Sequence, residues 1–551
     1  MNDSSNPPAP ATSTTTRRRV LRGLAVTTAA TAALCVPAAA SAAPATPGAR
    51  RPKTGATSAT YTLTLVHRSR TGAPTSSFRT QLTALSGPDA GTSLLAPEAA
   101  SGTVTVQVPA GRYLLDSTLS TKETDDTEHR GIDWLVQPRL DVDRDATIVL
   151  DARTTHPVDI RPPVADAQFE TCGAFIEVTY EGTTGFANLV SYTPDTRLAH
   201  LGPATESGAV RTWVDAYWNR TVGTCILGYT FRTDRALDGL VRHPAPGDLT
   251  TLVVRAAPGE PGAGAATLDV SPSSGPSPSI ARALTPPGSL TYLVTPERGP
   301  FDLVYASSAE PEKTPNIYYA LGVGLTAGTT KVVTFDTPVF GPALDSSPGA
   351  RSAAQRTGNA LDVTVPLLAD GDGHRPSAPL FTAATTTLYR DGTLVGTRRG
   401  TPGQGSFTLP SGRATYLLTA TAMRPRGSVT AAWTFTSAKT TTATELPLSA
   451  VRFSPELGID GTAPARAAST VGVTVLGAAE RSGVRSLVVS VSADRGASWT
   501  AVPVTGGRIA FTTPGDGGAV SLRAELTDTF GNTVTQTHID AYGTRAAAKA
   551  S

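Results

Sequence analysis

The sequence predicts an all-β protein, a tandem array of about four β-sandwich domains behind a signal peptide. Composition is the first observation: glycine (52) and proline (44) are abundant, whereas 17% of the 551 residues are charged and 6% are aromatic. Such a composition is typical of many short strands joined by tight turns. The second observation is that apolar and polar residues alternate over short segments, with no helical repeat of useful length. The third observation is the length of the chain, which exceeds what one compact core accommodates and so indicates several domains.

Residues 1–42 predict a signal peptide, the first element of the chain. Arg17 and Arg18 belong to a basic region that leads into an uncharged stretch rich in alanine and threonine. Ala40 and Ala42 then supply the small residues of a cleavage site. The arginine spacing favours the twin-arginine export route, with the general route as the alternative. A membrane anchor is disfavoured because the stretch is only mildly apolar and Pro37 interrupts it.

We therefore expect a secreted mature protein, cleaved after Ala42 and not associated with the membrane afterwards. Cleavage removes four arginines and one aspartate, which leaves 43 basic and 44 acidic residues. A net charge near −1 disfavours nucleic acid as a partner, since polyanion binding depends on basic surface. The expected partner is an extracellular protein or a polysaccharide, and the chain is expected to be a monomer.

The mature sequence divides into a leader and four strand-rich regions. Residues 43–57 are rich in proline and alanine and predict a flexible leader. The predicted β-sandwich regions are 58–162, 163–345, 346–446 and 447–543. Apolar residues alternate over Thr103–Pro109 in the first region, and Asp391-Gly392 predicts a tight hairpin turn in the third. A glycine- and proline-rich insertion at 256–287 interrupts the second region, which is either one sandwich or two small ones.

Two cysteines, Cys172 and Cys225, remain after the signal peptide is removed. In an oxidising compartment they are expected to form one disulfide, which closes a loop of about 54 residues and contributes about 3–4 kcal/mol to stability. A metal site would need further ligands nearby, and a catalytic thiol would need a partner histidine. The sequence shows neither beside these cysteines.

The motifs predict no catalytic, cofactor or metal site. Gly91–Pro97 resembles the nucleophile segment of subtilisin-like serine proteases, but a predicted strand follows Ser93 almost at once. The mature histidine upstream of it, His67, lies in strand-like sequence, so Ser93 is expected in an exposed loop without a base. The seven histidines are dispersed along the chain. Asp370–Gly373 lacks the ligand spacing of a calcium loop and predicts a glycine-rich turn.

Two further motifs have a functional and a structural interpretation. Trp213, Tyr217 and Trp218 suit either a carbohydrate-stacking platform or core packing, and we favour core packing. The segment from Ser492 to Trp499 fits an Asp-box, in which Asp494 binds turn amides, Gly496 permits a positive φ and Trp499 packs under the hairpin. Sialidase-type propellers carry several such boxes, whereas one copy indicates a structural turn and no glycosidase activity.

Four further stretches of the sequence are distinctive: Asp133–Pro138 (DWLVQP), Leu388–Gly392 (LYRDG), Ala432–Thr436 (AWTFT) and Val451–Leu457 (VRFSPEL). In these stretches the chain resembles the C-terminal accessory region of large secreted actinobacterial subtilisin-like serine proteases. Residues 527–533 are shared more loosely with bacterial immunoglobulin-like domains. The resemblance covers about residues 58–543 and implies immunoglobulin-, fibronectin- or prealbumin-like sandwiches. The family's peptidase domain is missing, so the resemblance implies no triad residue.

Three function classes follow from these observations. The first is a non-catalytic secreted protein that binds or adheres to an extracellular partner, polymer or cell wall. The second is an accessory, chaperone or inhibitor subunit that acts with a separate subtilisin-like protease. The third is a hydrolase whose site the motifs do not show. We favour the first class, in which the chain is not an enzyme and has no cofactor.

Overall fold

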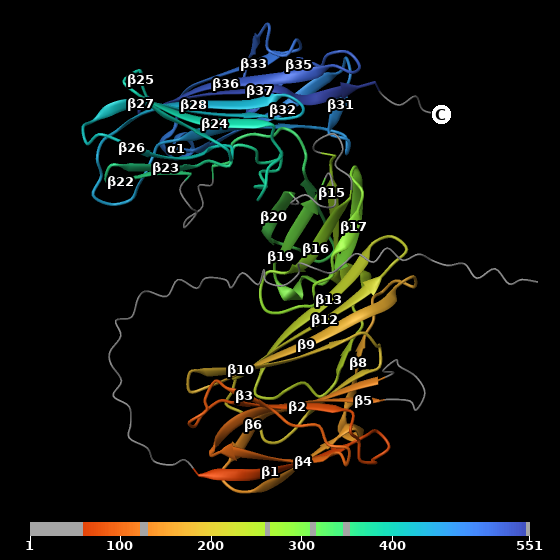
Figure 1. Cartoon of the computed structure of the whole chain (residues 1–551). Coiled ribbons are helices and arrows are strands. Elements are labelled where there is room, and N and C mark those ends of the chain that lie inside the picture. The colour runs from red at the N-terminus through yellow and green to blue at the C-terminus, as the bar shows by residue number, and fades with distance from the viewer. Residues whose placement is uncertain (1–58, 122–130, 259–264, 309–315, 345–352, 547–551) are drawn as a thin grey trace, which may run out of the picture. The chain divides into compact units, whose positions relative to one another are not determined.

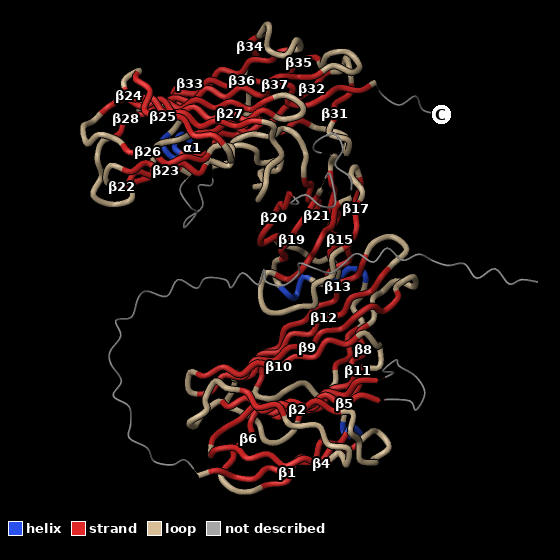
Figure 2. The backbone as a smooth tube through the Cα atoms, in the orientation of Figure 1, coloured by secondary structure: helices blue, strands red, loops and turns tan. Residues whose placement is uncertain are grey.

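The computed structural model describes residues 59–121, 131–258, 265–308, 316–344 and 353–546. Strands make up most of these residues, with one short helix, α1 (Ala478–Ser482), and three single 3₁₀ turns; Figure 2 shows the strands in red. The predicted all-β fold class is confirmed. Within these ranges no helix is both long and apolar enough to cross a membrane. The signal-peptide residues Arg17, Arg18, Ala40 and Ala42 lie outside them, as does the leader.

The first sandwich pairs a three-stranded sheet with a seven-stranded sheet. The small sheet has the order β4-β1-β7, with β1 (Thr60–Arg68), β4 (Thr103–Pro109) and β7 (Ala146–Asp151). Alternate residues of β4 are buried, as the sequence predicts. The large sheet has the order β14-β8-β11-β6-β5-β2-β3. Its strands are β2 (Phe78–Ala84), β3 (Ser93–Leu95), β5 (Gly111–Thr121), β6 (Gly131–Val142), β8 (His156–Ile160), β11 (Thr196–His200) and β14 (Leu240–Arg242).

A second seven-stranded sheet takes part in two hydrophobic cores. Its order is β10-β9-β12-β13-β18-β15-β21, and β9, β12 and β13 lie side by side in Figure 1. Its strands are β9 (Gln168–Tyr180), β10 (Thr183–Ser191), β12 (Val210–Asn219), β13 (Thr224–Thr233), β15 (Thr250–Ala256), β18 (Gly288–Val294) and β21 (Thr330–Phe335). The β9–β12 half shares a core with the first large sheet. The other half packs on the four-stranded sheet β17-β16-β19-β20.

This arrangement resolves the second predicted region into two cores joined by one continuous sheet. The four-stranded sheet contains β16 (Ala266–Pro272), β17 (Arg282–Leu284), β19 (Phe301–Ser307) and β20 (Asn316–Val323). The junction is a short parallel pairing between β13 and β18, in which Cys225 lies opposite Leu293. The segment 256–287, expected as an insertion, contains β16 and β17 and so supplies two strands of the four-stranded sheet. Because β18 starts after this segment, the pairing of β13 with β18 connects segments far apart in the sequence.

The C-terminal body contains three sheets around one core. A nine-stranded sheet runs β25-β24-β27-β28-β37-β36-β33-β34, with β31 also pairing with β37. The other two sheets run β26-β23-β22-β29 and β30-β32-β35. The strands are β22 (Ala354–Thr357), β23 (Ala360–Thr364), β24 (Ala383–Arg390), β25 (Thr393–Arg399), β26 (Gln404–Thr408), β27 (Ala414–Met423), β28 (Ser428–Ser437), β29 (Thr444–Glu445), β30 (Ser449–Pro455), β31 (Thr462–Pro464), β32 (Ala468–Gly477), β33 (Val484–Ser492), β34 (Thr500–Val502), β35 (Arg508–Thr512), β36 (Ala519–Asp528) and β37 (Thr533–Arg545).

Two expectations from the sequence can be compared with the structure of this body. Asp391 and Gly392 have φ values of 47° and 80° and connect β24 to β25, so the predicted tight hairpin is present. The boundary expected between residues 446 and 447 lies between strands of the same core. The regions on the two sides of this boundary share a core because β28 pairs with β37, which places strands from both regions in one sheet.

The core between the two seven-stranded sheets contains an acid whose ionisation opposes folding. Asp116 on β5 is buried, and Trp134 Nε1 donates to its Oδ1 at 3.4 Å. Burial raises the pKa of Asp116 to about 6. The folded state therefore binds the proton more tightly than the unfolded state, whose aspartates titrate near ~4. The contribution of Asp116 to the free energy of unfolding is therefore fully present below pH ~4 and is lost as the pH rises through 6.

Asp116→Asn is accordingly expected to raise the free energy of unfolding by about 1–3 kcal/mol at pH 7.5, and to change it little at pH 4. The asparagine has no charge to bury, and its amide oxygen still accepts from Trp134. Urea unfolding at the two pH values measures the difference. The exposed Asp143→Asn serves as the control and should leave both values unchanged. A gain from Asp116→Asn that is equal at both pH values would contradict the assignment.

Candidate functional site

The structure corrects the predicted disulfide between Cys172 and Cys225. Both cysteines are free and buried. Cys172 on β9 lies opposite Ala216 of β12, and Cys225 on β13 lies opposite Trp218 of the same strand. Strand β12 therefore separates them by two strand spacings, about 9–10 Å, beyond the ~4.4–6.8 Å that a disulfide spans. Two cysteines in an expected oxidising compartment were not enough to predict the bond, because a disulfide also depends on which strands are neighbours.

Neither thiol is suited to nucleophilic chemistry at neutral pH. Burial raises the pKa of Cys172 to about 12, with the nearby Asp215 carboxylate adding to the effect. Burial likewise raises the pKa of Cys225 to about 11. Because the thiolate is the reactive form, both side chains behave as small apolar groups.

Ser93 and His67 are held by separate hydrogen bonds. Ser93 lies at the start of the edge strand β3, not in the expected loop, and its Oγ lies 2.8 Å from Thr83 Oγ1. His67 is buried on β1, where Nδ1 contacts the Gly102 carbonyl oxygen at 2.9 Å and Nε2 contacts Thr80 Oγ1 at 2.7 Å. The partners that the structure gives Ser93 do not include an imidazole, so no serine–histidine pair forms there.

The acidic turn at Asp370–Gly373 has a structural role. The Asp370 carboxylate accepts from the His374 amide at 2.9 Å and from the Asp336 amide at 3.0 Å, and it lies 3.0 Å from His374 Nδ1. These contacts use the oxygens that a cation would need. Across the ranges that the structure describes, no group of three or more histidine, cysteine or acidic side chains is arranged to hold a metal.

The Asp-box segment forms a closed hydrogen-bonded turn. Ser492 Oγ donates to Asp494 Oδ1 at 2.7 Å, and the Ser498 amide donates to the same oxygen at 2.9 Å. The hydrogen bond from the Ser498 hydroxyl, followed by that from Ser492, lowers the pKa of Asp494 to about 2. Gly496 has a φ of 88°, and Trp499 lies under the Arg523 guanidinium. Both carboxylate oxygens of Asp494 therefore accept hydrogen bonds from within the turn.

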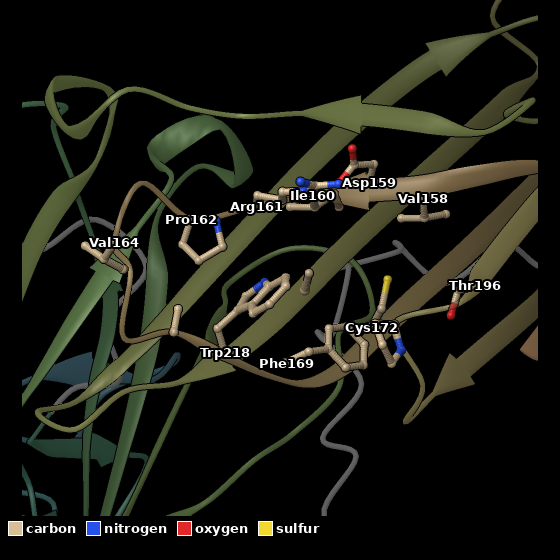
Figure 3. Close-up of a pocket in the computed structure, with 13 residues that line it drawn as sticks. Val158, Asp159, Ile160, Arg161, Pro162, Val164, Phe169, Cys172, Thr196 and Trp218 are labelled. Atoms are coloured by element: carbon tan, nitrogen blue, oxygen red, sulfur yellow. The ribbon is translucent and has the colours of Figure 1, made fainter. Parts of the chain in front are cut away.

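A cavity of about 330 Å³ lies between the two seven-stranded sheets and is the best-formed candidate site. We call it the inter-sheet cavity (Figure 3). Strands β8 and β11 of the first large sheet contribute to its lining from one side, β9 and β12 of the second seven-stranded sheet contribute from the other, and the segment between β8 and β9 lines it as well. The lining residues are Val158, Asp159, Ile160, Arg161, Pro162, Val164, Ala167, Phe169, Cys172, Pro194, Thr196, Ala216 and Trp218.

Aromatic side chains dominate one side of the cavity. Trp218 and Phe169 meet edge to face, with ring centroids 5.3 Å apart. Trp213 and Tyr217, which the sequence grouped with Trp218, are almost completely buried in the sandwich, as core packing predicts. Trp218 differs because alternate residues of a strand face opposite sides of the sheet: Ala216 and Trp218 line the cavity, whereas Tyr217 packs in the other core.

Charged side chains at the cavity are paired with one another. Asp159 Oδ1 accepts from Arg161 Nε at 2.6 Å, and its Oδ2 lies 3.1 Å from His243 Nε2. Burial opposes ionisation of Asp159, but these hydrogen bonds outweigh it and lower the pKa. The Arg161 side chain is largely exposed, so this ion pair marks the solvent side of the cavity. Sequence reasoning missed the cavity because its walls come from four separate strands.

Comparison with known proteins gives no family for the chain. No protein-family model matches it, and no curated protein matches it. The resemblance to protease accessory regions therefore stays a prediction.

Among solved structures, similar chains include a streptococcal ancillary pilin, with 12% identity and a TM-score of 0.13 over 50% of this chain and 99% of that one. The Bacillus anthracis TIE protein has 12% identity and a TM-score of 0.12 over 66% of both chains. A tetra-tandem repeat from the extending region of a large adhesion protein has 13% identity and a TM-score of 0.12, over 88% of this chain and 100% of the repeat. Values this low leave the function to be argued from the residues themselves.

Proposed function

We propose that the chain is an exported, non-catalytic β-sandwich protein that binds an extended segment of an extracellular protein. The observation that carries this proposal is a pair of sheet edges, β20 and β21, that flank a groove of about 730 Å³. β20 is the last strand of its four-stranded sheet, and β21 is the last strand of its seven-stranded sheet. A sheet edge carries unpaired amide and carbonyl groups, which a further strand can pair with.

Exposed apolar side chains accompany these edges. Tyr319 and Leu321 on β20 are 39% and 67% exposed, and Val332 on β21 is 44% exposed. Water around such side chains is released when a partner covers them. A strand added to the edge would satisfy the backbone while its alternate side chains contact this apolar surface.

A contact within the chain supports pairing at this edge. Tyr318 forms an antiparallel bridge with Pro376, and the Ser377 amide donates to the Ile317 carbonyl oxygen at 2.8 Å. This pairing covers only the start of β20. Among the strands that the structure describes, none pairs with the same edge further along, from Tyr319 to Val323. A polypeptide partner would continue the existing pairing, and for this reason we favour protein over polysaccharide.

The test measures binding of the exported chain to intact cells of the producing organism. Expression in an actinobacterial host should give a secreted chain that begins at Ala43, which N-terminal sequencing checks. Labelled chain should bind the cells saturably, and binding should fall at least tenfold for Leu321→Lys, because lysine on an edge discourages strand addition. Leu394→Lys on β25, which replaces another exposed leucine, is the matched control.

Protease treatment of the cells identifies the partner class. Loss of binding after this treatment supports a protein partner, whereas binding that survives it would contradict the polypeptide proposal and favour a polysaccharide. Absence of saturable binding would overturn the binding function itself. The same chain should not cleave casein or react with a fluorophosphonate, and labelling that disappears in Ser93→Ala would overturn its non-catalytic character.

A further inference from the structure

We propose that the segment bound at β20 is acidic, with two acidic side chains four residues apart and an apolar side chain midway between them. This inference rests on the proposed function, because it names the chemistry of the partner that the β20–β21 groove accepts. The free backbone groups of β20, the charge of the groove lining and the positions of its cations each support it.

The free backbone groups of β20 belong to alternate residues. The Ser377 amide donates to the Ile317 carbonyl oxygen, so the backbone groups of Ile317 face the open edge of the sheet. In an antiparallel sheet these groups point to one side and the other at alternate residues, which places those of Tyr319 and Leu321 on the same open edge. A partner strand can therefore pair with β20 at Tyr319 and Leu321.

The strand across the groove, β21, is protected against such pairing. Lys331 is exposed near its start, and a lysine on an edge strand discourages the addition of a further strand. Toward the other end of β21, the Thr334 amide already donates to Asp372 Oδ2 at 3.2 Å. The partner therefore pairs with β20 and directs side chains across the groove toward β21.

Cations outnumber acids in the lining of the groove. Its charged or titratable side chains are those of Lys331, Asp372, His374 and Arg375. His374 is engaged by Asp370, whose Oδ2 lies 3.0 Å from its Nδ1, so Asp372 alone opposes two cations. Lys331 has no ion-pair partner among the described residues. An acidic segment is favoured because it neutralises this excess of positive charge.

The positive charge continues beyond Arg375. A neighbouring pocket of about 330 Å³ shares Asp372 and Arg375 with the groove and is also lined by Arg452. The buried Arg452 guanidinium donates to three backbone carbonyl oxygens. Because carbonyl oxygens carry no formal charge, Arg452 adds to the positive potential at this end of the groove.

The positions of the two groove cations define the spacing of the acids. Lys331 lies near the start of β21, and Arg375 follows His374, whose ring lies 4.6 Å from that of Phe335 at the end of the strand. Four residues of extended chain separate Lys331 from Phe335, about 13 Å. Acidic side chains four residues apart leave a partner strand on the same face, so each can reach one cation. The side chain midway between them shares that face and meets Val332, which is 44% exposed.

The experiment uses the full mature chain and three acetylated, amidated and fluorescently labelled peptides, with fluorescence anisotropy as the measurement. TETVTET carries the proposed pattern, and TQTVTQT replaces both glutamates by glutamine. TETVETT has the composition of TETVTET, but its glutamates are three residues apart and therefore leave the strand on opposite faces.

TETVTET is expected to bind about three- to tenfold tighter than either control peptide at about 50 mM NaCl, as two exposed ion pairs allow. Raising the salt to about 500 mM should remove most of this difference, because salt screens charges at a protein surface.

Variants assign the two cations and the opposing acid. Lys331→Gln and Arg375→Gln should each remove part of the preference for TETVTET, whereas Lys439→Gln replaces another exposed lysine and should not. Asp372→Asn should tighten the binding of TETVTET about two- to threefold, since its amide oxygen can still accept from Thr334. Circular dichroism checks that each variant is folded, and Lys331→Glu replaces Arg375→Gln if that variant is not.

The results separate this inference from the proposed function. Cell binding that Leu321→Lys removes, together with a TETVTET that binds no tighter than TQTVTQT or does not bind, would overturn the acidic partner and leave binding at β20 in place. Affinities that folded Lys331→Gln and Asp372→Asn leave unchanged would also overturn it. Absence of binding to both the cells and the peptides would overturn the two proposals together.

Discussion

Arg298→Met is expected to lower the free energy of unfolding by about 3–5 kcal/mol at pH 7.5, the cost of leaving a buried charge without its partner. Arg298 and Asp215 are fully buried, with side-chain exposures of 0% each. Arg298 Nε donates to Asp215 Oδ1 at 2.8 Å, and Nη2 donates to Oδ2 at 3.1 Å. Methionine fills similar space, so the loss reports the missing charge and not a cavity.

The location of the pair makes the effect large. Asp215 lies in the middle of β12, and Arg298 reaches it from the turn before β19. The guanidinium also donates to the carbonyl oxygens of Ser274 and Pro276, at 3.0 and 2.8 Å. The Arg298 side chain thus donates to the buried Asp215 carboxylate and to two backbone carbonyl oxygens. Replacing Arg298 leaves these three acceptors without that donor.

The pH dependence separates charge from packing. Burial raises the pKa of Asp215 even though Arg298 opposes that shift. Without Arg298 the folded-state pKa should rise further, so the variant's deficit should be largest above that pKa and shrink as the pH falls and the carboxyl is protonated. Adding Asp215→Asn should recover part of the loss. Chemical denaturation from pH 5 to 8 measures these differences.

The exposed Arg255→Met on β15 is the control, with an expected change within about 0.5 kcal/mol. A loss below about 1 kcal/mol for Arg298→Met at pH 7.5 would contradict the view that the buried carboxylate needs this partner.

The fold class was predictable because it depends on local signals. Alternation in Thr103–Pro109 and the Asp391-Gly392 turn each specify a strand or a hairpin within a few residues, and both are present. Strand neighbours are not local. The parallel pairing of β13 with β18 joins strands that residues 256–287, among others, separate in the sequence. No residue pattern predicts this pairing.

The candidate site was less predictable for the same reason. Cys172 and Cys225 were predicted to form a disulfide, and this prediction is wrong because β12 lies between their strands. The inter-sheet cavity depends on which strands of two sheets face each other, because its lining comes from β8, β9, β11 and β12. The adjacent aromatic residues were the available signal, since two neighbours on a regular strand face opposite sides of the sheet.

Trp433→Ala is expected to lower the free energy of unfolding of the C-terminal body by about 3–5 kcal/mol, as for other buried tryptophans replaced by alanine. Trp433 lies on β28 and is 1% exposed. Its Nε1 donates to the Ser449 carbonyl oxygen at 2.7 Å. That bond crosses the boundary that the sequence suggested at residue 446, so the indole packs in a core to which both sides contribute.

The consequence is a test of how this body unfolds. If the regions on the two sides of residue 446 form one cooperative unit, hydrogen exchange should show β24 and β36 losing the same free energy of protection in Trp433→Ala. Trp433→Phe keeps the ring and should cost less. Loss of protection confined to β24, with β36 unchanged, would instead support two independent sandwiches. Equal loss is expected because β28 pairs with β37, and β37 pairs with β36, so neither half can lose its packing at Trp433 without disturbing a sheet that the other half shares.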